Sequence, residues 1–230
     1  MAPVRQNGGV AGTSDVSRPA RGPRRGRPPR LTREAIADAA LGLGFERLTL
    51  TTVADRLGVS HSALYRHVTD REGLVVAMLD RAIERAPWPP ETGDWRADLS
   101  AQAWTLWRLL EAHPGIEREV AALTGYPARM TERFGRAVDR LTGARFTAAD
   151  AFLAVDAVFD LTVAQFTQAR QVARTRRALT TADPGGDWAS AAGPAVAPMM
   201  RAALHDPPEV WFGRKLDLLL DGIATRATGG

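Results

Sequence analysis

Residues 48–74 read LTLTTVADRLGVSHSALYRHVTDREGL, and this stretch decides how the chain folds. Val53 and Leu57 lie four positions apart, so they share one face of a short helix. Thr49 stands where a helix begins, and Gly58 follows the apolar face at the position where a left-handed residue ends a helix. The spacing therefore predicts a short helix followed by a tight turn.

A second short helix is predicted directly after this turn. Ser60 is a typical N-cap residue, and Leu64 and Val68 lie four positions apart on the face that turns inward. Asp70 then caps a third helix. Two short helices joined by a glycine turn are typical of a helix-turn-helix.

The outward face of the second helix carries the predicted chemistry. Arginine matches guanine or a phosphate well, and a helix of this diameter fits the major groove of DNA with its first turn against the bases. The predicted base contacts are His61, Ser62, Ala63 and Arg66. The alternative is a solvated polar face on a helical hairpin that never meets DNA.

The run LYRHV at residues 64–68, followed by Asp70, Arg71, Glu72 and Leu74, resembles the DNA-binding domain of the tetracycline-repressor (TetR) family of bacterial regulators. Residues 31–45 and 49–58 resemble it too, and beyond residue 80 the resemblance is only architectural. It implies that Tyr65 and His67 hold phosphates and that Arg71 anchors the DNA backbone. The full set of predicted phosphate contacts is Thr49, Thr51, Ser60, Tyr65, His67 and Arg71.

Residues 1–30 carry seven arginines against one acid, Asp15, and are rich in glycine and proline. With little to bury, this tail is predicted to be disordered. Arg25 and Arg27 resemble a hook that enters the minor groove of DNA, so they are predicted to form a DNA arm. A basic leader that only aids solubility is the alternative.

The composition of the 230 residues narrows the class of protein. There is no cysteine, which excludes disulfides and thiolate chemistry. No apolar run is long enough to span a bilayer, and no signal peptide is recognisable, so we expect a cytoplasmic protein without a membrane partner. The sequence has no phosphate-binding glycine loop, metal-ligand spacing or nucleophile elbow. We therefore expect no enzyme activity, no cofactor and no metal.

The remaining sequence predicts an all-α fold. A first helix begins after Thr32, a connecting helix spans 70–85, and the later helices are expected at 98–112, 114–123, 128–141, 147–175, 188–204 and 211–227. The predicted domains are a helix-turn-helix domain at 31–76 and a larger helical domain for ligand binding and dimerisation at 77–230.

Two of these helices, 147–175 and 211–227, are apolar on two sides. Such a helix is either deeply buried or shared between a core and a partner. In addition, a helix-turn-helix protein with two-fold symmetry can place two recognition helices in successive major grooves. We therefore expect a homodimer whose interface includes Leu153, Ala157, Leu161, Ala164, Trp211 and Leu218.

A ligand pocket between the helices of residues 95–170 is also predicted. Its candidate lining is Trp104, Trp107, His113, Met130, Phe134, Phe152, Asp156 and Phe159. For each residue taken singly, an ordinary place in the core is the alternative. Asp156 and Asp160 form a carboxylate pair on an apolar helix that serves a ligand, the core or an interface.

Together these features predict a homodimeric transcriptional regulator that responds to a small molecule. We expect a repressor that leaves a palindromic operator in double-stranded DNA when its effector binds. One alternative is an architectural DNA-binding protein with the same reader and no ligand control. The other is a helical enzyme or carrier whose helix-turn-helix is incidental.

Overall fold

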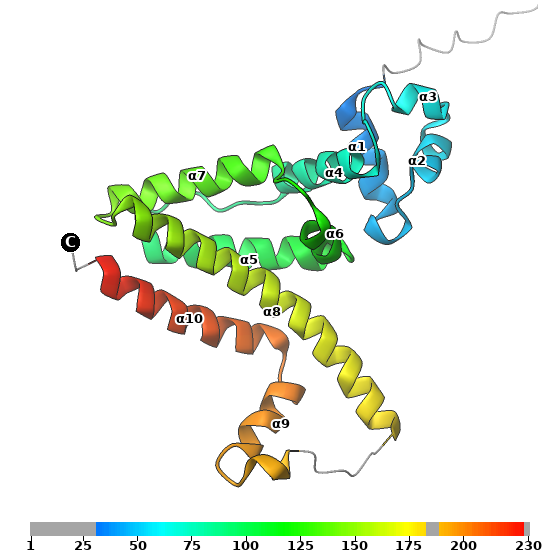
Figure 1. The fold of residues 1–230 in the computed structure, drawn as a ribbon. Coiled ribbons are helices and arrows are strands. Elements are labelled where there is room, and N and C mark those ends of the chain that lie inside the picture. The colour runs from blue at the N-terminus through cyan, green and yellow to red at the C-terminus, as the bar shows by residue number, and fades with distance from the viewer. Residues whose placement is uncertain (1–30, 183–188, 228–230) are drawn as a thin grey trace, which may run out of the picture. The chain divides into compact units, whose positions relative to one another are not determined.

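The computed structural model describes residues 31–182 and 189–227, and for residues 175–182 it describes secondary structure alone (Figure 1). All regular elements within these ranges are helical, which confirms the predicted all-α class. The predicted tail at 1–30, with Arg25 and Arg27, lies outside the described residues. The elements are α1 (Arg33–Leu43), η1 (Phe45–Arg47), α2 (Leu50–Leu57), α3 (His61–Leu64), α4 (Arg71–Arg85), α5 (Trp95–Ala112), α6 (Ile116–Ala122), α7 (Ala128–Gly143), α8 (Ala148–Ala182), η2 (Ser190–Ala192), α9 (Ala197–His205) and α10 (Pro208–Ala227).

The turn between α2 and α3 forms as predicted. Thr49 caps α2 by accepting a hydrogen bond from the backbone N–H of Thr52, and the Thr52 hydroxyl accepts one from the N–H of Thr49. Gly58 ends α2 in the left-handed conformation, with φ 65° and ψ 34°. This conformation costs an L-residue free energy, which explains the glycine.

The second helix of the motif is shorter than predicted. We expected it to continue to Val68, but α3 ends at Leu64 and residues 65–67 form a turn. The backbone N–H groups of His67 and Val68 both donate to the carbonyl of Leu64, at 2.8 and 3.0 Å, so the chain tightens there. Leu64 and Val68 are nonetheless both buried, as expected.

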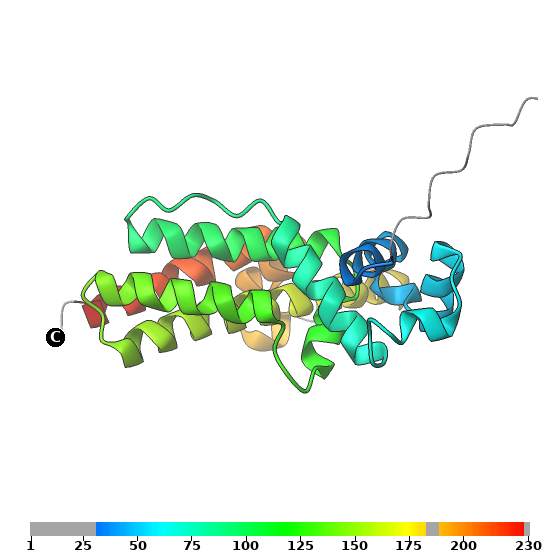
Figure 2. The same ribbon diagram turned by 90° about the horizontal axis from the view of Figure 1, so that it is seen from above.

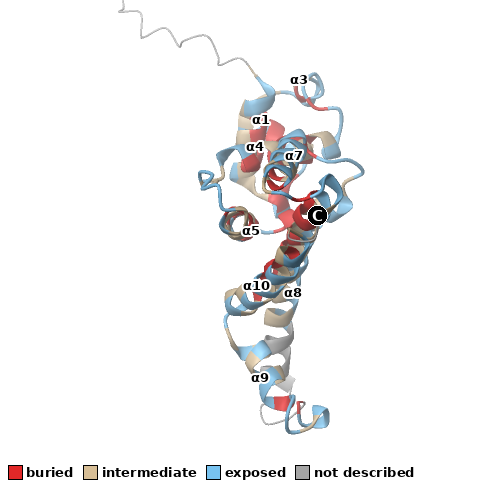
Figure 3. Cartoon of the chain, turned by 90° about the vertical axis from the view of Figure 1, so that its left-hand side faces the viewer, coloured by how far each residue is buried: buried red, intermediate tan, exposed pale blue. Residues whose placement is uncertain are grey.

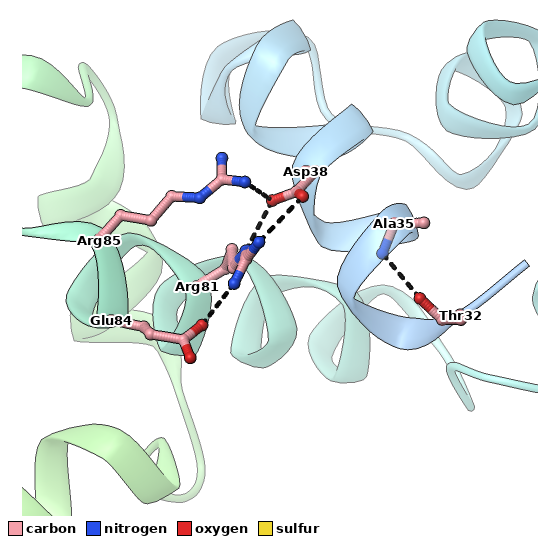
Figure 4. Close-up of polar contacts among 6 residues, drawn as sticks. All are labelled: Thr32, Ala35, Asp38, Arg81, Glu84 and Arg85. Carbon is pink, nitrogen blue, oxygen red and sulfur yellow. Dashed lines mark hydrogen bonds and ion pairs between the residues drawn. The ribbon is translucent and has the colours of Figure 1, made fainter.

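Helix α1 packs against α4 and joins the small domain to the rest of the chain. Asp38 on α1 accepts hydrogen bonds from Arg81 at 2.7 and 3.2 Å and pairs with Arg85 at 2.8 Å (Figure 4). These contacts, first of all the hydrogen bonds from Arg81, lower the pKa of the Asp38 carboxyl. Charge and apolar packing thus both hold α1 on α4.

The later helices match the expected number, but their ends differ. Helix α6 starts at Ile116 rather than Pro114, because Gly115 precedes it in a left-handed conformation with φ 93°. Helix α8 runs to Ala182 rather than to about residue 175. Helix α9 occupies part of the predicted 188–204 helix, and α10 begins at Pro208, a residue that suits a first helical position.

Helix α8 organises the larger domain, because α5, α7 and α10 all pack against it. Helix α4 also contacts α7, and Figure 2 shows α1, α2 and α3 at the end opposite the last turns of α10. Buried residues concentrate on the sides of α1, α4, α5, α8 and α10 that face these contacts (Figure 3).

Within the described ranges, no helix is both long enough and apolar enough to cross a membrane.

Candidate nucleic-acid interface and ligand cavity

The polar ridge predicted on α3 is present at the surface. The side chains of His61, Ser62 and Arg66 are exposed, and Ala63 is half-buried. Leu64 lies behind them, fully buried. An exposed row of donors on a helix anchored from behind has the chemistry needed to read base edges in a groove.

The residues predicted to hold phosphates surround this ridge. Thr51, Ser60 and His67 are exposed, and Tyr65 is 53% exposed, although it is an aromatic residue. The hydroxyl of Thr49 takes part in the cap of α2. Ser60 caps α3 by accepting a hydrogen bond from the N–H of Ala63 at 3.3 Å.

Arg71 is the one predicted phosphate contact that already has an acidic partner. Its two terminal nitrogens donate to the two carboxylate oxygens of Glu119 on α6, at 2.8 and 2.7 Å. This hydrogen bonding raises the pKa of Arg71 above its ordinary value. Half of the Arg71 side chain stays exposed, while Glu119 is 16% exposed. The first residue of α4 is thereby tied to the larger domain.

Two further acidic residues tie α4 to the larger domain. Glu72 accepts hydrogen bonds from the backbone N–H and the hydroxyl of Thr124, at 3.0 and 2.6 Å, and these bonds lower its pKa. Asp80 accepts a hydrogen bond at 2.9 Å from the backbone N–H of Arg129, in the first turn of α7. Polar contacts thus link α4 to α6, to the loop after α6 and to the start of α7.

An apolar cavity of about 100 Å³ lies between α4, α5, α6, α7 and α8. Two of its walls come from α4 itself, through Leu79 and Ile83. The opposite walls include Leu106 and Leu110 of α5, Val120 of α6, Met130 and Phe134 of α7, and Phe159 and Val163 of α8. An apolar cavity of this kind suits a small organic molecule.

Only Met130, Phe134 and Phe159 of the predicted pocket residues line this cavity. Trp104 and Trp107 do not, because α5 turns them towards α10. There Trp107 stacks on Phe212 with 4.6 Å between ring centroids, and Trp104 meets the same ring edge-on at 4.8 Å. Both tryptophans therefore belong to the contact between α5 and α10.

His113, Phe152 and Asp156 also lie outside the cavity lining. His113, at the end of α5, packs edge-on against Phe45 at 6.3 Å, and burial lowers the pKa of its imidazole. Phe152 is 53% exposed and touches Phe134 from outside. Asp156 is half-buried on α8. The pKa of the neighbouring Asp160 is raised, first by its own burial and then by the negative charge of Asp156.

The cavity has a charged residue in its wall that sequence reasoning missed. Arg133 of α7 lines the cavity, and its guanidinium carbon lies 3.6 Å from the ring centroid of Trp88. Its Nε atom is buried without a hydrogen-bond partner among the described residues. The available signal was its position, three residues after Met130 and four before Ala137, on the apolar face of the predicted helix.

The residues predicted to form the dimer interface lie on α8 and α10. Leu218 is 72% exposed and Leu153 is 49% exposed, which is unusual for large apolar side chains. Ala164 is exposed, and the other three predicted residues, Ala157, Leu161 and Trp211, are half-buried.

Among the described residues, no group of three or more histidine and acidic side chains is placed to hold a metal ion.

Comparisons with known proteins match both parts of the chain. Residues 43–78 match the family model described as bacterial regulatory proteins, tetR family, and residues 86–227 match that of the tetracyclin repressor-like C-terminal domain. The tetracycline repressor protein class C of Escherichia coli is 30% identical over 206 residues, which cover 84% of this chain and 91% of that protein.

Two further relatives come from Streptomyces. The HTH-type transcriptional repressor DrrR1 of Streptomyces coeruleorubidus is 34% identical over 120 residues, which span 46% of this chain and 44% of that protein. The crystal structure of the Streptomyces coelicolor TetR family protein ActR in complex with actinorhodin superposes with a TM-score of 0.72 at 20% identity, covering 87% of this chain and 99% of that one. At this identity the similarity concerns the fold alone.

Proposed function

Because the chain belongs to the TetR family of bacterial regulatory proteins, we propose that it acts as a homodimeric repressor released from palindromic DNA by a small molecule. This proposal rests on one observation: a single helix, α4, connects the exposed helix-turn-helix (called the reader here, α2 and α3) to the cavity. Helix α4 begins beside the reader, at Arg71, and contributes Leu79 and Ile83 to the cavity wall.

DNA recognition is assigned to α3 and its flanks. His61, Ser62, Ala63 and Arg66 are assigned to the bases, because three of them are exposed next to the buried Leu64 and Ala63 is half-buried between them. The phosphates are held by Thr49, Thr51, Ser60, Tyr65, His67 and Arg71 around this ridge. Arg25 and Arg27 of the basic tail add contacts in the minor groove.

Dimerisation is assigned to the apolar surface of α8 and α10. Covering Leu153 and Leu218 with the same helices of a second copy removes exposed apolar area from water. Two copies then present two α3 helices, which must lie about 34 Å apart to enter successive major grooves on one face of the duplex. A palindromic operator follows from this two-fold symmetry.

The cavity supplies the switch. At about 100 Å³ it is smaller than the roughly 300–1,000 Å³ of typical small-molecule sites, so a ligand must push its walls apart. Leu79 and Ile83 lie in these walls, and α6 and α7 are tied to α4 by polar contacts. Widening the cavity therefore tilts α4 and changes the spacing of the two readers. A coupling of about 1–3 kcal/mol is typical between such sites.

Selection from random duplex DNA tests the proposal. The purified protein is incubated with the pool, bound duplexes are sequenced, and the enriched site is footprinted. We expect a short inverted repeat with protection confined to it. Diffuse protection without an enriched sequence would instead support an architectural DNA-binding protein and contradict regulation of specific genes.

Single substitutions then separate the assigned roles. Tyr65→Ala should weaken binding to all duplexes alike and leave the base preference unchanged, because a phosphate contact carries no sequence information. Arg66→Ala should change which base is preferred at one position of each half-site. Arg108→Ala, an exposed arginine on α5, serves as the control and should leave both properties unchanged. A changed base preference in the Tyr65 variant would contradict the assignment.

A further inference from the structure

The cavity described above is lined by an arginine, Arg133. Within the described part of the chain, Arg133 makes no ion pair, and its Nε has no hydrogen-bond partner. Buried charges in proteins are normally paired, because an unpaired charge loses its hydration without compensation. Arg133 is half-buried, so its guanidinium loses part of its hydration without an acidic partner among the described residues.

The surroundings of Arg133 relieve this cost only in part. Its pKa is lowered to about 10, first by burial and then by the neighbouring charges of Arg136 and Arg140. Glu91 attracts the guanidinium from a distance, but its carboxylate is engaged in an ion pair with Arg140. The face of the guanidinium is covered by the Trp88 ring, which offers cation–π attraction but no hydrogen-bond acceptor.

Apart from Arg133, the lining of the cavity is mainly apolar and aromatic. Its lining includes Trp88, Met130, Phe134 and Phe159, which offer flat and polarizable apolar contacts. Among the other polar residues that line the cavity, Gln102 has no side-chain hydrogen bond within the described residues. Thr162 lines the cavity too, but its hydroxyl donates to the carbonyl of Val158 at 2.7 Å and is thereby occupied.

We propose that the effector is an aromatic acid whose anionic oxygen binds the Arg133 guanidinium while its ring system fills the apolar cavity between Phe134 and Phe159. This inference rests on the proposed ligand-controlled function and names the chemical class of its ligand. An oxyanion supplies the acceptors that Arg133 lacks, and a planar ring suits the aromatic wall. Gln102 supplies a further hydrogen-bond donor in the lining of the same cavity.

A matched pair of probes tests the charge requirement. 2-Naphthoate and 2-naphthamide have nearly the same shape, and only the first carries a negative charge. Binding is followed by the quenching of tryptophan fluorescence and confirmed by calorimetry. We expect the wild-type protein to bind the acid at least about tenfold more tightly than the amide, as is typical of hydrogen bonds to charged groups.

Two variants assign this preference to one residue. Arg133→Met keeps the length of the side chain without its charge, and it should abolish the preference for 2-naphthoate while changing 2-naphthamide binding less than about threefold. Arg136→Met removes a neighbouring arginine that is exposed and absent from the cavity lining, and it should keep the preference. Equal losses in the two variants would overturn the proposal, because they would reflect general electrostatics.

Thermal unfolding gives a readout that distinguishes this role from a structural one. Removing a half-buried charge that has no ion pair among the described residues should leave the melting temperature of Arg133→Met unchanged or higher without ligand. 2-Naphthoate should raise the melting temperature of the wild type and not that of the variant. A wild-type protein that binds neither probe, or binds both equally, overturns the proposal.

The outcome is separable from that of the proposed function. If Arg133→Met protects the selected DNA site as the wild type does and neither protein distinguishes the two probes, only the ligand class is wrong. If the acid preference is present but no DNA sequence is enriched, the ligand class stands and the regulatory proposal fails.

Discussion

The ion pair between Arg71 and Glu119 leads to a prediction about DNA affinity that runs against intuition. Arg71 is assigned to a phosphate, yet both of its terminal nitrogens are bound to the Glu119 carboxylate. If a DNA phosphate replaces the Glu119 carboxylate on binding, breaking the ion pair offsets part of the binding free energy that the phosphate contact provides. Glu119→Gln should therefore tighten DNA binding.

The magnitude follows from the geometry. Exposed ion pairs contribute about 0.2–1 kcal/mol, and bidentate geometry places this pair in the upper part of that range. Because Arg71 is 51% exposed, solvent screening excludes a value typical of buried pairs. If Glu119→Gln removes a cost of about 0.5–1 kcal/mol from DNA binding, the Kd of the variant should be roughly two- to fivefold lower than that of the wild type.

Fluorescence anisotropy with a labelled duplex carrying the selected site measures this change at several salt concentrations. Arg71→Ala should weaken binding and reduce the salt slope by about 1, because one phosphate contact is lost. The double variant should bind like Arg71→Ala alone, since Glu119 acts through Arg71. Glu132→Gln, which breaks an exposed ion pair with Arg129 inside α7, is the control for the change in net charge.

Two results would refute this reasoning. If Glu119→Gln weakened binding as much as Arg71→Ala does, the ion pair would serve to orient α4 rather than to compete with DNA. If the two single changes were additive in the double variant, Glu119 would act on DNA binding independently of Arg71.

Three further predictions concern stability. Gly58→Ala places a Cβ on a residue with φ +65°, so the free energy of unfolding in urea should fall by about 1 kcal/mol, and an unchanged midpoint would contradict the strain. Asp38→Asn should cost about 1–2 kcal/mol at neutral pH. Because the hydrogen bonds from Arg81 lower the pKa of Asp38 in the folded state, the stability difference between wild type and Asp38→Asn should shrink as the pH falls below about 4. A stability difference that does not change with pH would contradict this prediction. Burial lowers the pKa of His113, so the wild type should lose stability as the pH falls below about 6.5 while His113→Gln should lose less; parallel pH profiles would contradict this.

The DNA-binding part of the fold was predictable because its signals are local. The cap at Thr49, the left-handed Gly58 and the inward pair of Leu64 and Val68 each act over three or four residues. The length of α3 was not predictable, because apolar spacing does not distinguish a helical turn from the tighter turn at residues 65–67.

The polar contacts between the domains were beyond reach of the sequence. Arg71 and Glu119 are 48 positions apart, and Asp38 and Arg81 are 43 apart. Each of these charged residues reads as an ordinary solvated side chain until the helices are placed. Only tertiary structure decides which of the many possible pairs form.

The ligand cavity was predictable in kind but not in detail. Met130, Phe134 and Phe159 were identified from helical spacing, and so were Trp104 and Trp107, which face α10 instead. An aromatic residue on an apolar stripe has the same pattern whether it lines a cavity or fills a core. The direction of each stripe depends on where α8 and α10 lie.

The double use of α4 also constrains how such a protein evolves. A substitution at Leu79 or Ile83 changes both the cavity and the packing of α4, the helix that follows the helix-turn-helix. Most changes there will therefore damage gene control before a new effector is gained. Phe134 and Val163 line the cavity from helices outside the reader and can vary more freely. Descendants of this chain should therefore diversify their chemical specificity through α7 and α8 while preserving the α4 wall.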